Sequence, residues 1–520
     1  MVLTFAGVTA FRFLSTTGFS DDHYVHLSGA QQMQFGQWPS HDFVDLGMPL
    51  MYAVSAAARG IFGSSLLTEA ALVAAAFGLA AALTLKAAVD LSGSILVALG
   101  AVVLEVAIYP RSYSYPKVLM YVAGVVAMLR YVDRPSSARM VQLAVVVVAA
   151  FLMRHDHGLY LGVAGLVAVL SVCWQDGVCA ASSRVGAYAG LVVLLVLPYL
   201  LYLWAGTGVG EHVSAGLSLS EVERARTRLP WVSFDFTGPL ELNAAPWLYY
   251  VFYGLPLAAI AVSWWRPAVL PRERVLPLAV LALLVNAGVI RDSLWVRLPD
   301  AIAPAVLLLA ALLPVALAWR PAWARAAATA AAILVVVLTT ASAFDVGDAL
   351  ERLNRAGLFA ELDRLPERFD ERAAELADPL SPRQVPSTTA YALLPFFAYA
   401  HRCLGPRHFV LTPGFMSEVA VWTGRPFAGG QIWYQPGVLA TPAAHALVLE
   451  RLTSQTVPVT ILRAPEYAGL VSTFPELDVY VKRHFSQMAS FDSPSGALVV
   501  LMNMALATGR DETTGWPCFQ

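Results

Sequence analysis

The sequence contains few charged residues. Only 13% of its 520 residues are charged, whereas soluble domains carry about 25%. The formal net charge is −2, so the chain has no bulk electrostatic attraction for nucleic acid, which we exclude as a partner. A sequence repeat and a glycine-rich phosphate loop are also absent. The low share of charged residues therefore speaks against an ordinary soluble domain.

Cysteine is scarce as well. Cys173, Cys179, Cys403 and Cys518 show neither the spacing of a metal site nor a disulfide framework. Cys403 and Cys518 both lie in the C-terminal part, so a single bridge could join them. The first apolar stretch has no small-residue cleavage site before Asp21, and we therefore expect no cleavable signal peptide.

Hydrophobic residues are abundant, at 58% of the chain. In the first two thirds they form recurring runs near the ~20 residues that a membrane helix needs. The apolar stretch Leu46–Ile61 is predicted to be a helix lying at the membrane interface. The remaining runs predict eleven spans, at 2–19, 66–89, 94–109, 118–131, 140–153, 158–174, 185–205, 246–265, 275–290, 299–319 and 326–344.

Basic residues in short connecting loops set the orientation of a membrane protein. With a cytoplasmic N-terminus, the inner connectors carry ten Lys and Arg residues scattered among Pro and Ser. The basic residues of the outer connectors instead lie beside acids, histidines and aromatics, which is typical of a site. Eleven spans in this orientation place the C-terminus outside the cytoplasm.

The composition changes near Phe344, after which charged residues become dense through Asp345–Asp378. Beyond this stretch, β-rich and helix-like segments alternate, which is typical of a small α/β domain. We predict a membrane domain at 1–345, with its first outer loop at 20–65, and an extracytoplasmic α/β domain at 346–520. The β-rich segments are His408–Thr412, Val457–Leu462 and Ala497–Met502, and the helical ones are Pro442–Leu452 and Leu477–Phe485.

The first outer loop begins with the acidic pair Asp21 and Asp22, followed by His23 and Tyr24. Two carboxylates directly after a membrane helix lie at the bilayer surface. Either one could accept a proton from an acceptor hydroxyl or bind a metal ion through oxygen. The alternative is a solvated helix terminus. The amides and aromatics that follow in the loop favour the functional interpretation.

A second polar segment, Tyr109–Lys117, lies between the third and fourth predicted spans. Two prolines prevent a regular helix there, and Arg111, Tyr113 and Lys117 stand at the outer interface. Arg and Lys bind phosphate, although Tyr and Lys are also common interface anchors. Glu105, one turn inside the third span, is a candidate functional acid because charge inside a membrane is costly.

The third polar segment, Arg154–Gly158, occupies the turn between the fifth and sixth spans. His155 and His157 are two residues apart, so a regular helix would point them in opposite directions. A shared metal site with Asp156 would need a turn, which Gly158 permits. Histidine and aspartate suit Zn or Mn. The alternative is a polar cap on a tight turn. We assign Arg154 to the same phosphate as Arg111.

The fourth segment contains Arg291, Asp292 and Arg297 at the outer end of the ninth span. An internal ion pair and a contact with substrate are both consistent with this pattern. In the predicted topology all four polar segments emerge on the same side of the membrane. Reaction of a lipid-phosphate donor with a water-side acceptor needs this layout, with a base for the hydroxyl and cations for the leaving phosphate.

The chain resembles the glycosyltransferase C superfamily, in particular bacterial relatives of the protein O-mannosyltransferases and the lipid A aminoarabinose transferase. The likeness lies in an N-terminal helix, an acidic pair in the first outer loop, an interfacial helix, an array of spans and an extracytoplasmic C-terminal domain. It covers residues 1–160 by motif and the rest by architecture. The motif residues are Asp21-Asp22-His23-Tyr24, Gly36-Gln37-Trp38-Pro39, Asp42-Phe43 and Pro49-Leu50.

The resemblance implies an inverting glycosyltransferase of the bacterial inner membrane that uses a polyprenyl-phosphate sugar and an extracytoplasmic glycan, lipid or protein acceptor. Asp21 or Asp22 is then the base or a metal ligand. A divalent ion (Mg, Mn or Zn) held by Asp22, His155, Asp156 and His157 is the one cofactor we consider. Donor contacts are assigned to Arg111, Tyr113, Lys117, Arg154, Arg291 and Arg297, with Glu105, His23 and Tyr24 as further site residues.

Two departures limit what carries over. The acidic pair is Asp-Asp, whereas Asp-Glu is common in the mannosyltransferases. The C-terminal domain does not resemble their carbohydrate-binding fold, so the donor sugar and the acceptor stay open. The stretch Thr423–Gly430 could reach back to the membrane site or be an ordinary glycine-rich turn. Rival functions are a transporter or flippase of lipid-linked saccharides, a polymerase or ligase using a diphosphate-linked glycan, and a structural membrane subunit.

Overall fold

The chain divides into two compact units. The first unit contains residues 1–16, 71–199 and 223–369, and the second contains 17–70, 200–222 and 370–520. The predicted division at residue 345 stays a prediction. The structure is a computed structural model that describes residues 1–16, 18–227, 232–234, 237, 241–289, 294–318, 322–347, 349–357, 362–378, 388–438 and 441–520.

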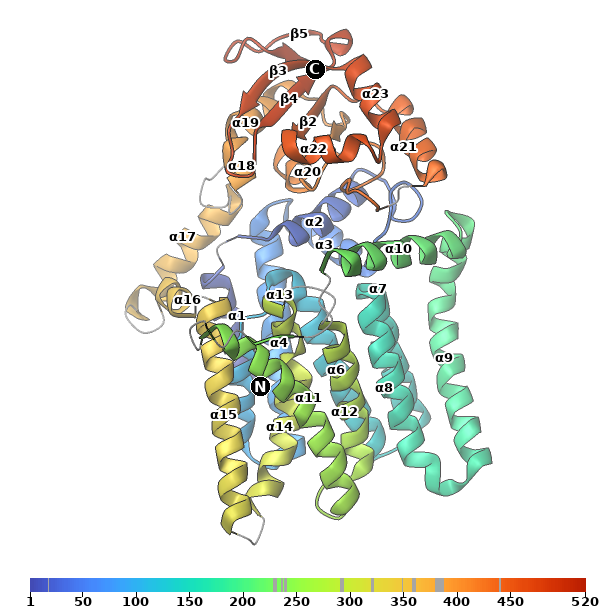
Figure 1. Cartoon of the computed structure of the whole chain (residues 1–520), viewed down its shortest axis with the longest axis vertical. Coiled ribbons are helices and arrows are strands. Elements are labelled where there is room, and N and C mark those ends of the chain that lie inside the picture. The colour runs from blue at the N-terminus through green and yellow to red at the C-terminus, as the bar shows by residue number, and fades with distance from the viewer. Residues whose placement is uncertain are drawn as a thin grey trace. The chain divides into compact units, whose positions relative to one another are not determined.

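The first unit is an array of apolar helices that lie side by side (Figure 1). Every predicted span coincides with one of its helices. Prolines lie inside α9 and α11, as they do more often in membrane helices than in soluble ones. The helices are α1 Val2–Leu14, α4 Leu66–Ser92, α5 Ile95–Ala107, α6 Tyr115–Asp133, α7 Ser137–Met153, α8 His155–Cys173, α9 Val178–Ala205, α11 Glu241–Trp265, α12 Arg272–Val289, α14 Ile302–Leu317 and α15 Ala322–Gly347.

Length and hydropathy identify the chain as a multi-pass membrane protein. Among the described residues, seven helices are long and apolar enough to cross a membrane. Three further apolar helices, α1, α5 and α7, are shorter. The predicted number of eleven spans therefore stays a prediction. The seven candidates are Leu66–Ser92, Ser112–Asp133, His155–Cys173, Val178–Ala205, Asn243–Trp265, Leu298–Leu317 and Arg325–Ser342.

The second unit contains a four-stranded sheet in the order β1-β2-β4-β3. Strand β1 pairs parallel to β2, and β4 pairs antiparallel to β2 and β3. The three β-rich segments and two helical segments predicted in this region are confirmed, whereas β3 was missed. The strands are β1 Val410–Leu411, β2 Val459–Arg463, β3 Ser486–Phe491 and β4 Leu498–Met502, and the matching helices are α21 Pro442–Ser454 and α23 Pro475–His484.

Burial explains both the core of this unit and the missed strand. Strand β2 is buried over four of its five residues, while β3 is a partly exposed edge strand with a register shift between Gln487 and Ala489. Such a strand carries only a weak apolar alternation. The core beside the sheet is formed by Leu411, Val448, Leu452, Leu470, Phe474, Leu477 and Val481.

The first loop folds into two helices of the second unit, α2 Asp21–Gln34 and α3 Pro49–Phe62. The predicted interfacial helix Leu46–Ile61 is thus helical, and its place at the interface stays a prediction. The helices pack tightly at Gly29, where an added Cβ would stand 2.7 Å from the Tyr52 ring. This close approach explains the glycine in the middle of α2, where it otherwise costs stability.

A disulfide joins Cys403 to Cys518 within the second unit. It connects the end of α19 Leu394–Cys403 to the short strand β6 Pro517–Cys518. The bridge considered from the sequence is therefore present, across a sequence separation of 115 residues. Of the other two cysteines, Cys173 is buried and Cys179 is exposed, and neither forms a disulfide.

Candidate functional site

The predicted acidic pair forms the first turn of α2, after the N-cap residue Ser20. Acids at this position favour the helix, because the helix dipole is positive at its N-terminus. Asp21 is exposed and Asp22 is partly buried. Partial loss of water and the neighbouring charge of Asp22 raise the pKa of Asp21, and Arg463 opposes this rise. Asp21 is thus an accessible carboxylate that holds its proton more tightly than a free aspartate.

A third acid, Glu418, faces this pair from α20 Glu418–Thr423 in the same unit. Its side chain is only 1% exposed. Burial and the nearby charge of Asp21 raise the pKa of Glu418 to about 8, so it is mostly a neutral carboxylic acid at neutral pH. Sequence reasoning missed Glu418, because nothing local distinguishes it from the surface acids of the predicted α/β domain.

The helices α2 and α20 are held together by polar contacts. Ser28 donates a hydrogen bond to the carbonyl of Ser417, at 2.6 Å. Gln31 donates to the carbonyls of Ala420 and Arg425, at 2.7 and 3.0 Å. The fully buried Tyr24 ring packs against Trp422, with centroids 6.2 Å apart. This packing fixes Glu418 relative to the first turn of α2.

The glycine-rich stretch Thr423–Gly430 continues this contact. Gln32 donates to the carbonyl of Phe427 and accepts from its N–H, both at 3.1 Å. Gly424 ends α20 in the left-handed region, at φ +63°, where glycine carries no steric penalty. The stretch is therefore a structured turn against α2. A role at a membrane site stays a prediction.

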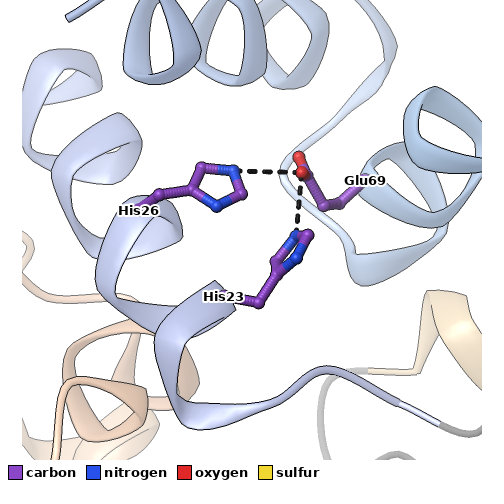
Figure 2. A group of neighbouring side chains, drawn as sticks. All are labelled: His23, His26 and Glu69. Atoms are coloured by element: carbon purple, nitrogen blue, oxygen red, sulfur yellow. Dashed lines mark hydrogen bonds and ion pairs between the residues drawn. The ribbon is translucent and has the colours of Figure 1, made fainter. Parts of the chain in front are cut away.

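Directly after the acidic pair on α2, two histidines meet a glutamate (Figure 2). The Nε2 atoms of His23 and His26 lie 3.0 and 3.1 Å from Glu69 Oε1. All three side chains are fully buried. Burial and the adjacent His26 ring lower the pKa of His23 to about 4, so its imidazole is neutral at physiological pH. The sequence prediction included His23 but missed its two partners.

In the first unit, Lys117 and Asp300 form a buried ion pair with an Nζ–Oδ2 distance of 2.5 Å. Both side chains line a small pocket together with His157, Tyr160 and Arg297. The pocket volume of about 10 Å³ holds roughly one water molecule. Of the predicted donor-binding residues, Lys117 and Arg297 are thus brought together. A phosphate would need these side chains to move apart.

Arg154 belongs to a neighbouring polar group in the same unit. It donates a hydrogen bond to the Tyr113 hydroxyl at 2.8 Å and lies 3.5 Å from Asp156 Oδ1. The Tyr113 ring is also 5.6 Å from Lys117 Nζ. Predicted residues from the second and third polar segments therefore meet through Tyr113.

The two histidines of the third segment have different neighbours. His155 stacks on Phe151, with centroids 4.3 Å apart, whereas His157 hydrogen-bonds the Tyr121 hydroxyl. His157 Nε2 lies 3.5 Å from Asp156 Oδ2, but the ligand atoms of His155, Asp156 and His157 do not form one group within 4.8 Å among the described residues. Asp22 belongs to the other compact unit, so an ion shared by all four residues stays a prediction and we derive no step through one.

Arg111, Glu105 and Arg291 complete the set of predicted site residues. Arg111 stands partly buried at the start of the 3₁₀ turn Ser112–Ser114. Glu105 accepts a hydrogen bond from Thr84 between α5 and α4, and a functional role for this acid stays a prediction. Arg291 lies outside the described residues. Asp300 was missed because its partner Lys117 lies 183 positions away, although a lone acid in an apolar run is itself a signal.

Comparison with known proteins identifies the fold. No protein-family model matches the sequence, and no curated protein matches it either. The crystal structure of ArnT from Cupriavidus metallidurans bound to undecaprenyl phosphate is similar over 97% of this chain and 98% of that chain, with a TM-score of 0.53 and 14% sequence identity. The predicted fold, an array of apolar helices with a mixed α/β region toward the C-terminus, is thereby confirmed as that of the ArnT structure.

Two structures of the Archaeoglobus fulgidus oligosaccharyltransferase are more distant. The complex with Zn and sulfate is 14% identical with a TM-score of 0.45, over 96% of this chain and 72% of that chain. The AglB complex with an inhibitory peptide and a dolichol-phosphate is 14% identical with a TM-score of 0.44, over 96% and 73%. We base the fold assignment on the ArnT comparison.

Proposed function

We propose that this chain is a membrane glycosyltransferase that moves a sugar from a polyprenyl-phosphate donor to an extracytoplasmic acceptor, with inversion at the anomeric carbon. The observation that carries the proposal is the acidic cluster of Asp21, Asp22 and Glu418, in which Asp21 is exposed at the first turn of α2. The ArnT structure that shares the fold holds undecaprenyl phosphate, which supports a polyprenyl-phosphate ligand for this chain.

In the proposed reaction, Asp21 accepts the proton of an acceptor hydroxyl as its oxygen attacks the anomeric carbon. The bond from that carbon to the phosphate oxygen breaks on the opposite face, and polyprenyl phosphate leaves. A raised pKa suits this role, since general bases work best when their pKa approaches the working pH. Protonated Glu418 avoids a third negative charge in the cluster. We assign Asp22 to holding the acceptor or the base in place.

The cationic residues Lys117, Arg154 and Arg297 are proposed to stabilise the leaving phosphate, because positive charge is most useful where negative charge develops. Each lies in a buried or partly buried polar group of the first unit. The disulfide of the second unit supports an extracytoplasmic location for that unit, since disulfides persist in oxidising compartments. A bacterial inner membrane fits such a chain.

The test replaces Asp21 and Asp22 singly with Asn and measures sugar transfer from polyprenyl-phosphate donors in membranes. Loss of a general base costs about 10²- to 10⁴-fold in rate, so Asp21→Asn should fall by this factor. Asp492→Asn, at an exposed acid of the same unit, is the matched control and should retain full activity. If transfer survives both substitutions in the acidic pair, the catalytic assignment is wrong.

The same membranes distinguish the rival functions. Transfer only from diphosphate-linked glycans would indicate a polymerase or ligase. Movement of a labelled lipid-linked saccharide across reconstituted vesicles, without transfer from any donor, would indicate a flippase. Neither transfer nor movement, with a partner protein bound to the second unit, would indicate a structural subunit.

A further inference from the structure

The buried cluster of His23, His26 and Glu69 has no direct part in the proposed transfer, and its two histidines follow the acidic pair on α2. His23 and His26 are three residues apart on α2, so both rings project from the same side of the helix, as Figure 2 shows. Glu69 comes from the first turn of α4. The cluster therefore joins two elements that are separate in sequence.

Its geometry matches a set of metal ligands. Each residue offers one ligand atom, and these atoms all lie within 4.8 Å of one another. The two Nε2 atoms are 3.0 and 3.1 Å from the shared carboxylate oxygen. Zn²⁺ binds His nitrogen and carboxylate oxygen at about 2.0–2.2 Å, and ligands at that radius around a tetrahedral ion stand about 3.3 Å apart. Small side-chain movements would admit an ion.

The polar atoms of the cluster are incompletely satisfied. Glu69 Oε2 and His23 Nδ1 are buried and have no hydrogen-bond partner, and both residues are 0% exposed. Leaving one oxygen of a fully buried carboxylate unbonded is costly. A divalent cation held by both carboxylate oxygens would satisfy Oε2 and compensate the charge of the carboxylate.

Arg59 of α3 carries a positive charge near Glu69 of the cluster. Its Nη2 donates to Gln31 Oε1 at 3.3 Å, while its Nε and Nη1 atoms have no hydrogen-bond partner. Arg59 thus makes no hydrogen bond to Glu69 among the described contacts. The guanidinium is oriented toward Gln31 and does not occupy the position between the two imidazoles and the carboxylate.

We propose that His23, His26 and Glu69 bind one divalent transition-metal ion, with a preference for Zn²⁺ because two imidazoles and one carboxylate suit it. Ser55 Oγ, 3.1 Å from His26 Nε2, or a water molecule takes the fourth position. The ion connects the first two turns of α2 to the start of α4. It thereby positions the acidic pair, and its binding does not depend on the proposed function.

The first experiment measures metal binding to the full chain in detergent micelles or nanodiscs. The protein is stripped with a chelator and titrated with Co²⁺, which gives intense visible bands in a tetrahedral site. One equivalent should bind to wild type, and Glu69→Gln and His26→Gln should weaken binding at least tenfold. His484→Gln, at an exposed histidine of the same unit, should bind like wild type.

Asp22→Asn separates this site from a metal held by the acidic pair. Unchanged Co²⁺ binding in Asp22→Asn supports the proposal. A loss in Asp22→Asn together with unchanged binding in Glu69→Gln overturns it. The proposal is also overturned if the wild-type chain binds no Co²⁺, or if it binds Co²⁺ no more tightly than Glu69→Gln.

Two measurements keep the proposal testable if a variant folds poorly. Zn²⁺ should raise the thermal unfolding midpoint of wild type and of His484→Gln. Pulsed electron paramagnetic resonance of Cu²⁺-loaded wild type should count two coordinated imidazoles, and this needs no variant. The assignment is overturned if fewer than two imidazoles coordinate Cu²⁺. It is also overturned if Zn²⁺ does not change the thermal unfolding midpoint of the wild type.

Discussion

Two buried carboxylates, Asp300 of the first unit and Glu418 of the second, are accommodated in opposite ways. Asp300 is 4% exposed and pairs with the ammonium of Lys117 at 2.5 Å. Glu418 is 1% exposed and faces another acid, Asp21, instead of a paired cation. Asp300 has a cationic partner within contact distance, whereas the raised pKa of Glu418, about 8, favours its protonated form at neutral pH. The neighbour, more than burial itself, decides the state of a buried acid.

The largest loss of stability should come from removing one partner of the Lys117–Asp300 ion pair. Lys117→Met leaves the Asp300 charge buried without its partner, which costs about 3–5 kcal/mol. We expect a large drop in the denaturant midpoint of unfolding in detergent. The double variant Lys117→Met/Asp300→Leu should recover most of this loss. Lys86→Met, which removes the partly exposed partner of Asp90, is the control and should change stability by at most about 1 kcal/mol. If Lys117→Met and Lys86→Met lowered the free energy of unfolding equally, the buried pair would be no more important for stability than the exposed one.

The disulfide offers a contrast between the units that does not involve charge. Replacing Cys403 and Cys518 with Ser should cost about 2–5 kcal/mol, because the unfolded chain regains the freedom of a long closed loop. Limited proteolysis should then release fragments of the second unit at lower denaturant concentration. Cys179→Ser, at an exposed cysteine outside the bridge, should leave the cleavage pattern unchanged. Resistance equal to wild type in the double variant would contradict a formed bridge.

Glu418 predicts a pH dependence of the free energy of unfolding. Its pKa rises from 4.5 to about 8 on folding, so the folded chain binds one more proton than the unfolded chain between these values. Stability from this group is therefore complete below about pH 4.5 and is lost as pH rises toward about 8, by at most roughly 1.4 kcal/mol per pH unit. In Glu418→Gln, the free energy of unfolding should change less with pH over this range. Near pH 8 the variant should be more stable than wild type.

The control for this profile is Glu512→Gln, at an exposed acid of the same unit, which should follow the wild-type curve. Asp300→Asn sharpens the comparison further, because it removes the partner of Lys117 and should destabilise the chain. A Glu418→Gln variant with a constant loss at every pH would show that the carboxyl is ionised in the folded chain.

The smallest effect concerns the base itself. Arg463 lowers the pKa of Asp21, so Arg463→Gln should raise it further. Because the base must be unprotonated, the acidic limb of the pH profile of sugar transfer should move upward by a fraction of a pH unit. The alkaline plateau should not change. Arg510→Gln, at an exposed arginine of the same unit, should leave the limb in place. A downward shift would rule out Asp21 as the titrating group.

The local pattern of apolar and polar residues predicted many of the helices and strands. Each apolar run predicted as a span coincides with a helix, and most of the β-rich and helical segments of the C-terminal region are where the sequence predicts them. Both signals depend on neighbours within a few residues, through the spacing of apolar side chains. Strand β3 was missed because a half-exposed edge strand has little apolar contrast.

The acidic pair, the polar turns and the apolar runs were determined by the sequence itself, since adjacent residues define them. The tertiary structure alone decided the partners of His23, Lys117 and Asp21. Glu69 lies 46 positions from His23, and Lys117 lies 183 from Asp300. No local pattern encodes such pairs, because chain packing brings them together and burial then fixes their charge. The protonated state of Glu418 follows from the same cause.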